Sequence, residues 1–283
     1  MKLPSIVDSH VHLWNPEELN YPWLTGMPSL NRTFLPADFS AATAHTNVEK
    51  MIFIEAGCDA AQGLEEVKWV SRMAETEPRL KGIVAHASLE KGEAVRPELA
   101  ALASIPLVKG IRRLLQGERN VDFCLLPSFV TGVKLLAEFG FSFDVCIRHD
   151  QLPAVTELAH RLPQVVFILD HLGKPDVRNH HQEPWAANLK ALAALPNVVC
   201  KISGLATEAD HARWQPADLK FYLARAGSFF GPDRILFGSD WPVATLAADY
   251  ERWIKTVADV FSPTGDSVLN RLFTTNAERI YHV

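Results

Sequence analysis

Residues 6–12 read Ile-Val-Asp-Ser-His-Val-His, a short stretch with several β-branched residues that is followed by a long polar and aromatic segment. Seven further short runs with strand-like composition recur along the chain, and most are apolar in their middle. Strands of this kind are buried on both faces, as in a parallel sheet. We therefore predict eight strands, at Ile6–His12, Lys50–Ala56, Lys81–Ala87, Leu107–Arg113, Phe141–Ile147, Val165–His171, Asn197–Ser203 and Arg234–Asp240.

Segments with apolar residues at helical spacing separate most of these strands. Strand and helix alternate through the whole chain without a break in composition, which predicts a single-domain α/β fold, a (β/α)8 TIM barrel over residues 1–283. A doubly wound open sheet is the alternative, and the lack of a GxGxxG turn or a GxxxxGK[ST] loop disfavours it. The predicted helices are Ala60–Glu77, Ser128–Phe139, Leu152–Arg161, Glu183–Leu195, Pro216–Ala226 and Leu246–Val260.

Composition limits the classes of function. The 283 residues are 48% hydrophobic and carry a net charge of −5, and they contain no basic run, so we expect no nucleic-acid partner. No apolar run approaches the ~18 residues of a membrane span, and the first residues lack the apolar core of a signal peptide, so we expect a cytoplasmic protein without membrane contact. The four cysteines form no CxxC pair and are predicted to be core residues. A homo-oligomer is left open, since barrels occur both as monomers and in symmetric assemblies.

Three histidines and one aspartate are the candidates for chemistry. His10 and His12 are two residues apart on the first strand, so their side chains point to one face and can share a divalent cation. Asp240 ends the eighth strand, which neighbours the first in a closed barrel, and can ligate a metal or act as a general base. His171 ends the sixth strand at the same rim. The alternatives are a hydrogen-bonded histidine pair, a carboxylate that caps a helix and a loop histidine.

Cationic side chains also occur on two predicted strands. Lys109, Arg112 and Arg113 lie on the fourth strand and Lys201 on the seventh. Lys109 and Arg113 share one face of the strand, and Arg112 lies on the other. One of these cations is predicted to polarise a carbonyl or to bind a substrate hydroxyl. The alternative is a set of ion pairs with Glu55, Asp144 or Asp170.

Several motifs occur together and in order over Val7 to about Tyr281, namely DSHVHLW from Asp8, YPWL from Tyr21, KGIR from Lys109, HLGKP from His171, KISG from Lys201, FGSDWP from Phe237 and NAERIY from Asn276. In this combination the chain resembles the amidohydrolase superfamily, in particular its amidohydrolase-2 group of sugar lactonases. The resemblance implies a barrel with its site at the carboxyl ends of the strands. It matches His10 and His12 to the family's first-strand pair, His171 to its sixth-strand histidine and Asp240 to its eighth-strand aspartate.

The chain departs in one respect from the pattern of metal-dependent members of the superfamily, and this limits the number of metal ions that the resemblance implies. Metal-dependent members of the wider superfamily commonly place a further histidine or a lysine on strand four or five. The predicted fifth strand, Phe141–Ile147, contains no histidine, and His149 follows it. We therefore expect one divalent metal, zinc first, held by His10, His12 and Asp240 with His171 near. Metal-independent hydrolysis stays open.

The resemblance implies hydrolysis of a small-molecule sugar lactone, of the L-fuconolactone type, to its aldonic acid. Arg113 or His171 is expected to polarise the carbonyl, and Asp240 to take a proton from water and return it to the leaving ring oxygen. Two alternatives are a non-oxidative decarboxylase, which releases carbon dioxide, and a non-catalytic barrel that binds a sugar acid. The residues predicted to bind substrate are Trp14, Trp23, Lys109, Arg112, Lys201 and Trp241.

Overall fold

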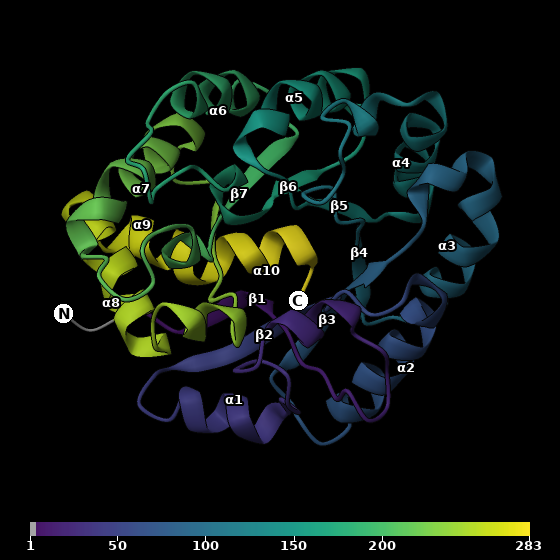
Figure 1. The fold of residues 1–283 in the computed structure, drawn as a ribbon, viewed down its shortest axis with the longest axis horizontal. Coiled ribbons are helices and arrows are strands. Elements are labelled where there is room, and N and C mark those ends of the chain that lie inside the picture. Colours follow the sequence, from purple (N-terminus) through teal and green to yellow (C-terminus); the bar gives the residue numbers. More distant parts are fainter. Residues whose placement is uncertain (1–3) are drawn as a thin grey trace.

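The computed structural model describes residues 4–283 and contains one sheet of eight parallel strands in sequence order. Helices surround the sheet, which confirms the predicted (β/α)8 barrel (Figure 1). Met1–Leu3 lie outside the described residues. They belong to the amino-terminal stretch in which we expect no signal peptide. The strands are β1 (Ile6–Val11), β2 (Val48–Ile54), β3 (Leu80–His86), β4 (Val108–Arg112), β5 (Ser142–Val145), β6 (Phe167–Leu169), β7 (Val198–Ile202) and β8 (Ile235–Phe237).

The helices of the described residues include all six that the sequence predicts. Four others were not predicted, because helices this short show too few turns for a hydrophobic period. No helix within residues 4–283 is long and apolar enough to cross a bilayer. The helices are α1 (Pro36–Ala42), α2 (Gly63–Ala74), α3 (Arg96–Ala103), α4 (Pro127–Phe139), α5 (Leu152–Arg161), α6 (Trp185–Ala193), α7 (Pro216–Phe230), α8 (Tyr250–Phe261), α9 (Asp266–Asn270) and α10 (Asn276–Tyr281).

The barrel closes where the segment after β8 meets β1. The His12 amide donates to the Trp241 carbonyl at 2.8 Å, and the Asp240 amide donates to the His10 carbonyl at 2.9 Å. The buried Asp8 carboxylate accepts a further hydrogen bond from the Ser239 amide at 2.8 Å. These contacts bring Asp240 beside His10 of β1 and beside His12, which directly follows β1, although about 230 residues separate them in the sequence.

Helix α10 covers the end of the barrel at which the strands begin, opposite to the carboxyl ends of the strands (Figure 1). Tyr281 is fully buried there, and its hydroxyl donates to Asp144 at 2.6 Å. Lys50, early in β2, forms an ion pair of 2.6 Å with Glu278 on the same helix. The amino-terminal end of the barrel is therefore filled, and a substrate site is left to the carboxyl ends of the strands.

Candidate active site

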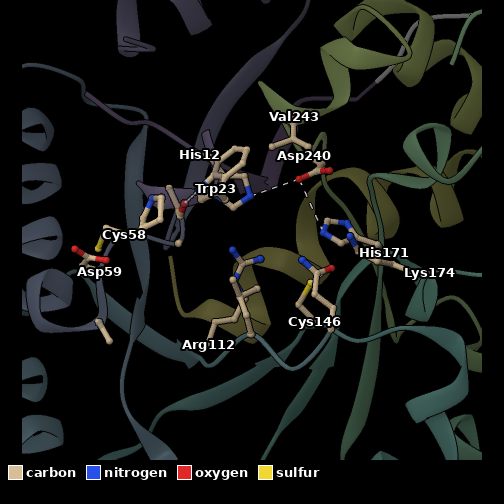
Figure 2. Close-up of a pocket in the computed structure, with 16 residues that line it drawn as sticks. His12, Trp23, Cys58, Asp59, Arg112, Cys146, His171, Lys174, Asp240 and Val243 are labelled. Carbon is tan, nitrogen blue, oxygen red and sulfur yellow. Dashed lines mark hydrogen bonds and ion pairs between the residues drawn. The ribbon is translucent and has the colours of Figure 1, made fainter. Parts of the chain in front are cut away.

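A pocket of about 500 Å³ opens at the carboxyl ends of the strands (Figure 2). Its size suits a small molecule, and it combines apolar walls with a few polar groups, as ligand sites commonly do. It lies at the end of the barrel where active sites of this fold occur. The lining residues are His12, Pro22, Trp23, Ala56, Gly57, Cys58, Asp59, Ala60, Arg112, Leu114, Gln116, Cys146, His171, Lys174, Asp240 and Val243.

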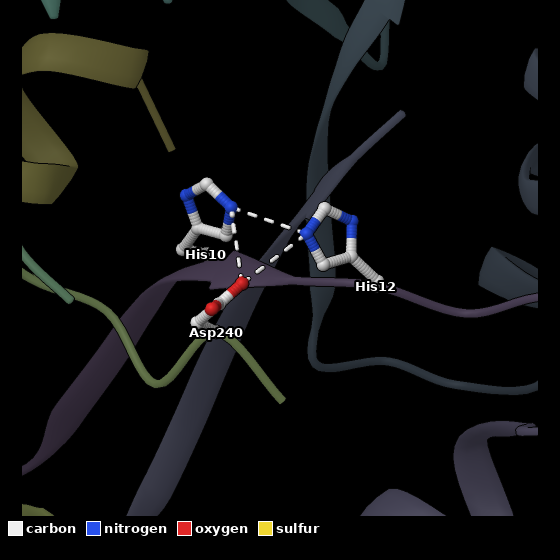
Figure 3. Close-up of side chains that lie close together, drawn as sticks. All are labelled: His10, His12 and Asp240. Atoms are coloured by element: carbon white, nitrogen blue, oxygen red, sulfur yellow. Dashed lines mark hydrogen bonds and ion pairs between the residues drawn. The ribbon is translucent and has the colours of Figure 1, made fainter. Parts of the chain in front are cut away.

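Two imidazoles and one carboxylate lie close together at this pocket, and two of these residues, His12 and Asp240, line it (Figure 3). His10 Nε2 lies 3.2 Å from His12 Nε2. Asp240 Oδ1 lies 3.4 Å from His12 Nε2 and 3.7 Å from His10 Nε2. All three residues are buried. The structure thus brings together the three residues that the sequence predicts as metal ligands.

The surroundings of the two rings decide which nitrogen carries the hydrogen. His12 Nδ1 lies 2.8 Å from the Ile54 carbonyl oxygen, which only accepts, so Nδ1–H donates and Nε2 keeps a lone pair. His10 Nδ1 lies 3.3 Å from Asp170 Oδ1 and 3.4 Å from Lys201 Nζ. The Arg112 guanidinium, which only donates, lies 3.4 Å from His10 Nε2, so this nitrogen also keeps a lone pair. Two lone pairs and a carboxylate oxygen then face one another, an arrangement that a cation stabilises. Ligand atoms about 2.0–2.1 Å from a tetrahedral zinc lie about 3.3 Å apart, so these residues fit the ion.

His171 lies on the other side of Asp240 from His12, with its Nε2 3.9 Å from Asp240 Oδ1 and its ring centroid 4.5 Å from that of His10 (Figure 2). Its Nδ1 lies 2.9 Å from the Ser203 hydroxyl oxygen. Burial lowers the pKa of His171 to about 4, against the opposing charge of Asp240, so the ring is neutral near pH 7. A Ser203 hydroxyl that donates to Nδ1 leaves an Nε2–H that can donate to a substrate oxygen.

Asp240 is ionised in this environment. Burial alone would raise its pKa, but His171, His12 and His10 together hold it below the usual range of an aspartate. Its backbone is left-handed, with φ of 63°, an unfavourable conformation for a residue with a side chain and one that is concentrated at functional sites. Gly204, itself at φ of 59°, packs against both His171 and Asp240.

Known proteins resemble this chain over most of its length. The model of the amidohydrolase family matches residues 7–283. The chain belongs to the amidohydrolase family. It is 34% identical over 271 residues to an L-fucono-1,5-lactonase of Burkholderia multivorans, covering 88% of each chain. It is 25% identical over 334 residues to an L-rhamnono-gamma-lactonase of Scheffersomyces stipitis, covering 98% of each. A solved amidohydrolase of B. multivorans with bound zinc is 31% identical, with a TM-score of 0.88 over 99% of this chain and 100% of that one.

Two cations of this amidohydrolase are held by buried acids. Arg112 reaches the pocket, but its guanidinium donates to Glu55 Oε1 at 2.7 Å and to Asp170 Oδ2 at 3.2 Å. Lys201 is fully buried beneath the pocket, where its ammonium contacts Asp144 and lies 3.1 Å from Asp170 Oδ1. Lys201 therefore supports the carboxylates from below and does not reach the position of a substrate, contrary to the sequence-based prediction.

The other two predicted cations also need correction. Arg113 is not among the pocket-lining residues of the described chain, because it directly follows β4 and its side chain points to the opposite side from that of Arg112. Its guanidinium pairs with Glu118 at 2.7 Å and with Glu90 at 3.2 Å. Lys109 lies at the amino-terminal end of β4, beside Gly82, and away from the pocket. The prediction that Arg113 polarises the carbonyl is therefore not supported by its position.

The three predicted tryptophans separate into one pocket residue and two supporting residues. Trp23 lines the pocket, and its indole nitrogen donates to the Ala56 carbonyl at 2.8 Å. Trp14 is fully buried and donates to the Arg32 carbonyl at 2.8 Å. Trp241 packs edge-on against Phe34 and Phe39. Trp14 and Trp241 thus stabilise the loops over the barrel, and only Trp23 offers a ring to a ligand.

Three polar residues of the pocket were not predicted from the sequence. Asp59, Gln116 and Lys174 line it together with the predicted groups. Lys174 could have been found from the sequence, because it stands three residues after His171 in the HLGKP motif. Asp59 and Gln116 lie in loops after β2 and β4, and nothing in their local sequence distinguishes them from surface residues.

A buried acid supports the wall of the pocket from behind. Glu66 of α2 is fully buried and accepts a hydrogen bond from the Ala56 amide at 3.1 Å. Burial and the charge of Glu55 raise its pKa to about 8, while the Ala56 amide, the Tyr21 hydroxyl and Arg112 act in the opposite direction. Glu66 is therefore protonated at neutral pH.

This raised pKa predicts a pH effect on stability. Between its ordinary pKa of 4.5 and about 8, folded Glu66 holds a proton that the unfolded chain releases, so stability falls as pH rises, by up to about 1.4 kcal/mol per pH unit. Glu66→Gln keeps an acceptor for the Ala56 amide and has no proton to lose. We expect urea unfolding at pH 6 and pH 8.5 to show a smaller loss of stability for Glu66→Gln than for the wild type. Glu65→Gln, which changes an exposed neighbour, should follow the wild type. Equal losses in all three proteins would contradict the raised pKa.

Proposed function

We propose that this amidohydrolase hydrolyses a sugar lactone of the L-fuconolactone type to its aldonic acid. The observation that carries the proposal is an ionised carboxylate, Asp240, placed among His10, His12 and His171 at the bottom of a pocket for small molecules. The relatives named L-fucono-1,5-lactonase and L-rhamnono-gamma-lactonase support a sugar lactone as the substrate class.

The chemistry follows from the positions of two of the polar groups that line the pocket, Asp240 and His171. Asp240 takes a proton from water as the water oxygen attacks the lactone carbonyl carbon. The carbonyl π electrons move to its oxygen, and the neutral His171 donates a hydrogen bond to that oxygen as the charge develops. The intermediate then collapses, the bond from carbon to the ring oxygen breaks, and Asp240 returns the proton to the ring oxygen.

A divalent cation fits the same site, and we propose zinc. His10, His12 and Asp240 would hold it, because their three ligand atoms lie 3.2–3.7 Å apart and the Nδ1 atoms of both rings face acceptors. The zinc-bound amidohydrolase at 31% identity supports the choice of metal. When bound, the cation supplies Lewis-acid polarisation of the carbonyl.

The pocket disfavours both alternatives. A decarboxylase would use an arginine to bind the substrate carboxylate, but Arg112 is already offset by Glu55 and Asp170. A protein that only binds a sugar acid would gain nothing from an ionised Asp240 at the position of an anionic ligand, since like charges repel. A neutral, hydroxylated lactone suits this environment better than either acid.

The test is a panel of aldonolactones, followed by acid release with a pH indicator. The panel includes L-fucono-, L-rhamnono-, L-galactono- and D-arabinonolactone, each with purified protein and with a blank without protein. We expect acid release above the blank for at least one of them, and a lower rate after chelation that zinc restores. No acid release from any lactone, with and without added zinc, would contradict the proposed function.

A further inference from the structure

A run of four left-handed residues follows β6. His171, Leu172, Gly173 and Lys174 have φ values of 51°, 57°, 70° and 47°. Three of them carry side chains, for which this conformation is unfavourable, so the surrounding structure must hold it in place. The Lys174 amide donates to the His171 carbonyl at 2.9 Å and closes the turn.

This turn places the side chains of His171 and Lys174 on the same side of the backbone. In a turn closed by a hydrogen bond between residues i and i+3, the side chains of these two residues are nearly eclipsed. Both line the same pocket, and Figure 2 shows them next to each other. The left-handed turn therefore delivers a lysine to the pocket together with the histidine that the sequence singles out.

Carboxylates offset the charge of Lys174 less than that of Arg112, the other cation of the pocket. Among the residues that the structure describes, the Lys174 ammonium has one ion-pair partner, Glu208, at 3.5 Å. Its side chain is 21% exposed, so donors remain for a ligand. Burial alone would lower the pKa of Lys174, but neighbouring groups, including Glu208 and Asp240, raise it, so the ammonium stays charged.

We propose that Lys174 is a further catalytic residue, whose ammonium donates a hydrogen bond to the oxygen that becomes negative as the lactone opens. The inference rests on the proposed function. The substrate is neutral, the intermediate carries an oxyanion after Asp240 has taken the proton of water, and the product carries a carboxylate. A fixed cation therefore stabilises the intermediate and the product more than the substrate, and Lys174 keeps its own protons throughout.

The test compares Lys174→Met with Lys190→Met, which removes an exposed lysine from α6. We expect kcat of Lys174→Met to fall roughly 100-fold, as for loss of one oxyanion donor, while KM for the neutral lactone changes by less than about 3-fold. Inhibition by the aldonate product should weaken about tenfold, since a charged hydrogen bond is lost. Lys174→Arg should recover part of the product inhibition, and Lys190→Met should match the wild type in all three quantities.

Two results would overturn the inference. A raised KM with unchanged kcat in Lys174→Met would mean that the lysine binds a hydroxyl of the substrate equally in the ground and transition states. Unchanged kcat, KM and product inhibition would mean that it has no part in the reaction. Failure of the proposed function is distinguishable, because in that case the wild type itself opens no lactone. Thermal unfolding of each variant checks that the compared proteins are folded.

Discussion

Asp240→Asn is expected to lower kcat for lactone hydrolysis about 1,000-fold and to leave the fold intact. An amide has nearly the same shape as the carboxylate but does not accept a proton from water. The wild-type carboxylate lies 3.4 Å from His12 Nε2 and 3.9 Å from His171 Nε2, and these imidazoles help to keep its pKa below the usual range. The change thus removes the base and replaces one of the three proposed metal ligands, while the backbone contact between Asp240 and His10 remains.

Asp249→Asn is the matched control for this variant. Asp249 precedes α8 and accepts a hydrogen bond from the Arg252 amide at 2.7 Å, a capping role that asparagine also fills. We expect Asp249→Asn to keep both activity and stability. Initial rates at saturating lactone measure the difference, and an Asp240→Asn protein with more than about a tenth of the wild-type kcat would rule out Asp240 as the general base.

Gly204→Ala is expected to produce the second large loss, about 100-fold in kcat, through displacement of catalytic groups. A Cβ atom on Gly204 would lie 2.5 Å from His171 Nδ1 and 2.8 Å from Asp240 Oδ2, closer than real Cβ contacts allow. Either side chain must move, and both contribute to the reaction. The glycine is also left-handed at φ of 59°, so alanine adds backbone strain of about 1–2 kcal/mol.

Gly140→Ala separates these two effects. Gly140 ends α4 at φ of 72°, and in the described chain no atom beyond its immediate neighbours lies within 4 Å of the position of its Cβ. Both variants should lose stability through backbone strain, and Gly204→Ala should lose more because of its close contacts, but only Gly204→Ala should lose activity per folded molecule. Equal activity of the two variants would show that the close approach at Gly204 does not position the site.

The barrel was predictable from the sequence because each strand is a short run of strand-like composition, and helix or turn residues stand on both sides of it. The meeting of His10, His12 and Asp240 was predictable as well, from the alternation of side chains along β1 and from closure of β8 against β1. These two rules require only local sequence and the order of the strands. The same rules say little about α10, whose Tyr281 is recognisable as a plug only through its contact with Asp144.

The cations were harder to place. Alternation along β4 separates Arg112 from Arg113, but it does not say which of them faces the interior. That choice depends on the register between β3 and β4, which shifts between Ile83 and Val84. Lys174 was missed for a different reason, since a left-handed turn made mostly of residues with side chains has no local sequence rule and is held by its surroundings.

The most direct test of lactone hydrolysis uses water labelled with oxygen-18. The lactone of the panel with the highest rate is incubated with the wild type and with Asp240→Asn, and the product is analysed by mass spectrometry early in the reaction. The account predicts an aldonate with one labelled oxygen in its carboxylate, formed well above the blank by the wild type and about 1,000-fold more slowly by Asp240→Asn. Release of carbon dioxide, or equal rates in the wild type, Asp240→Asn and the blank, would contradict it.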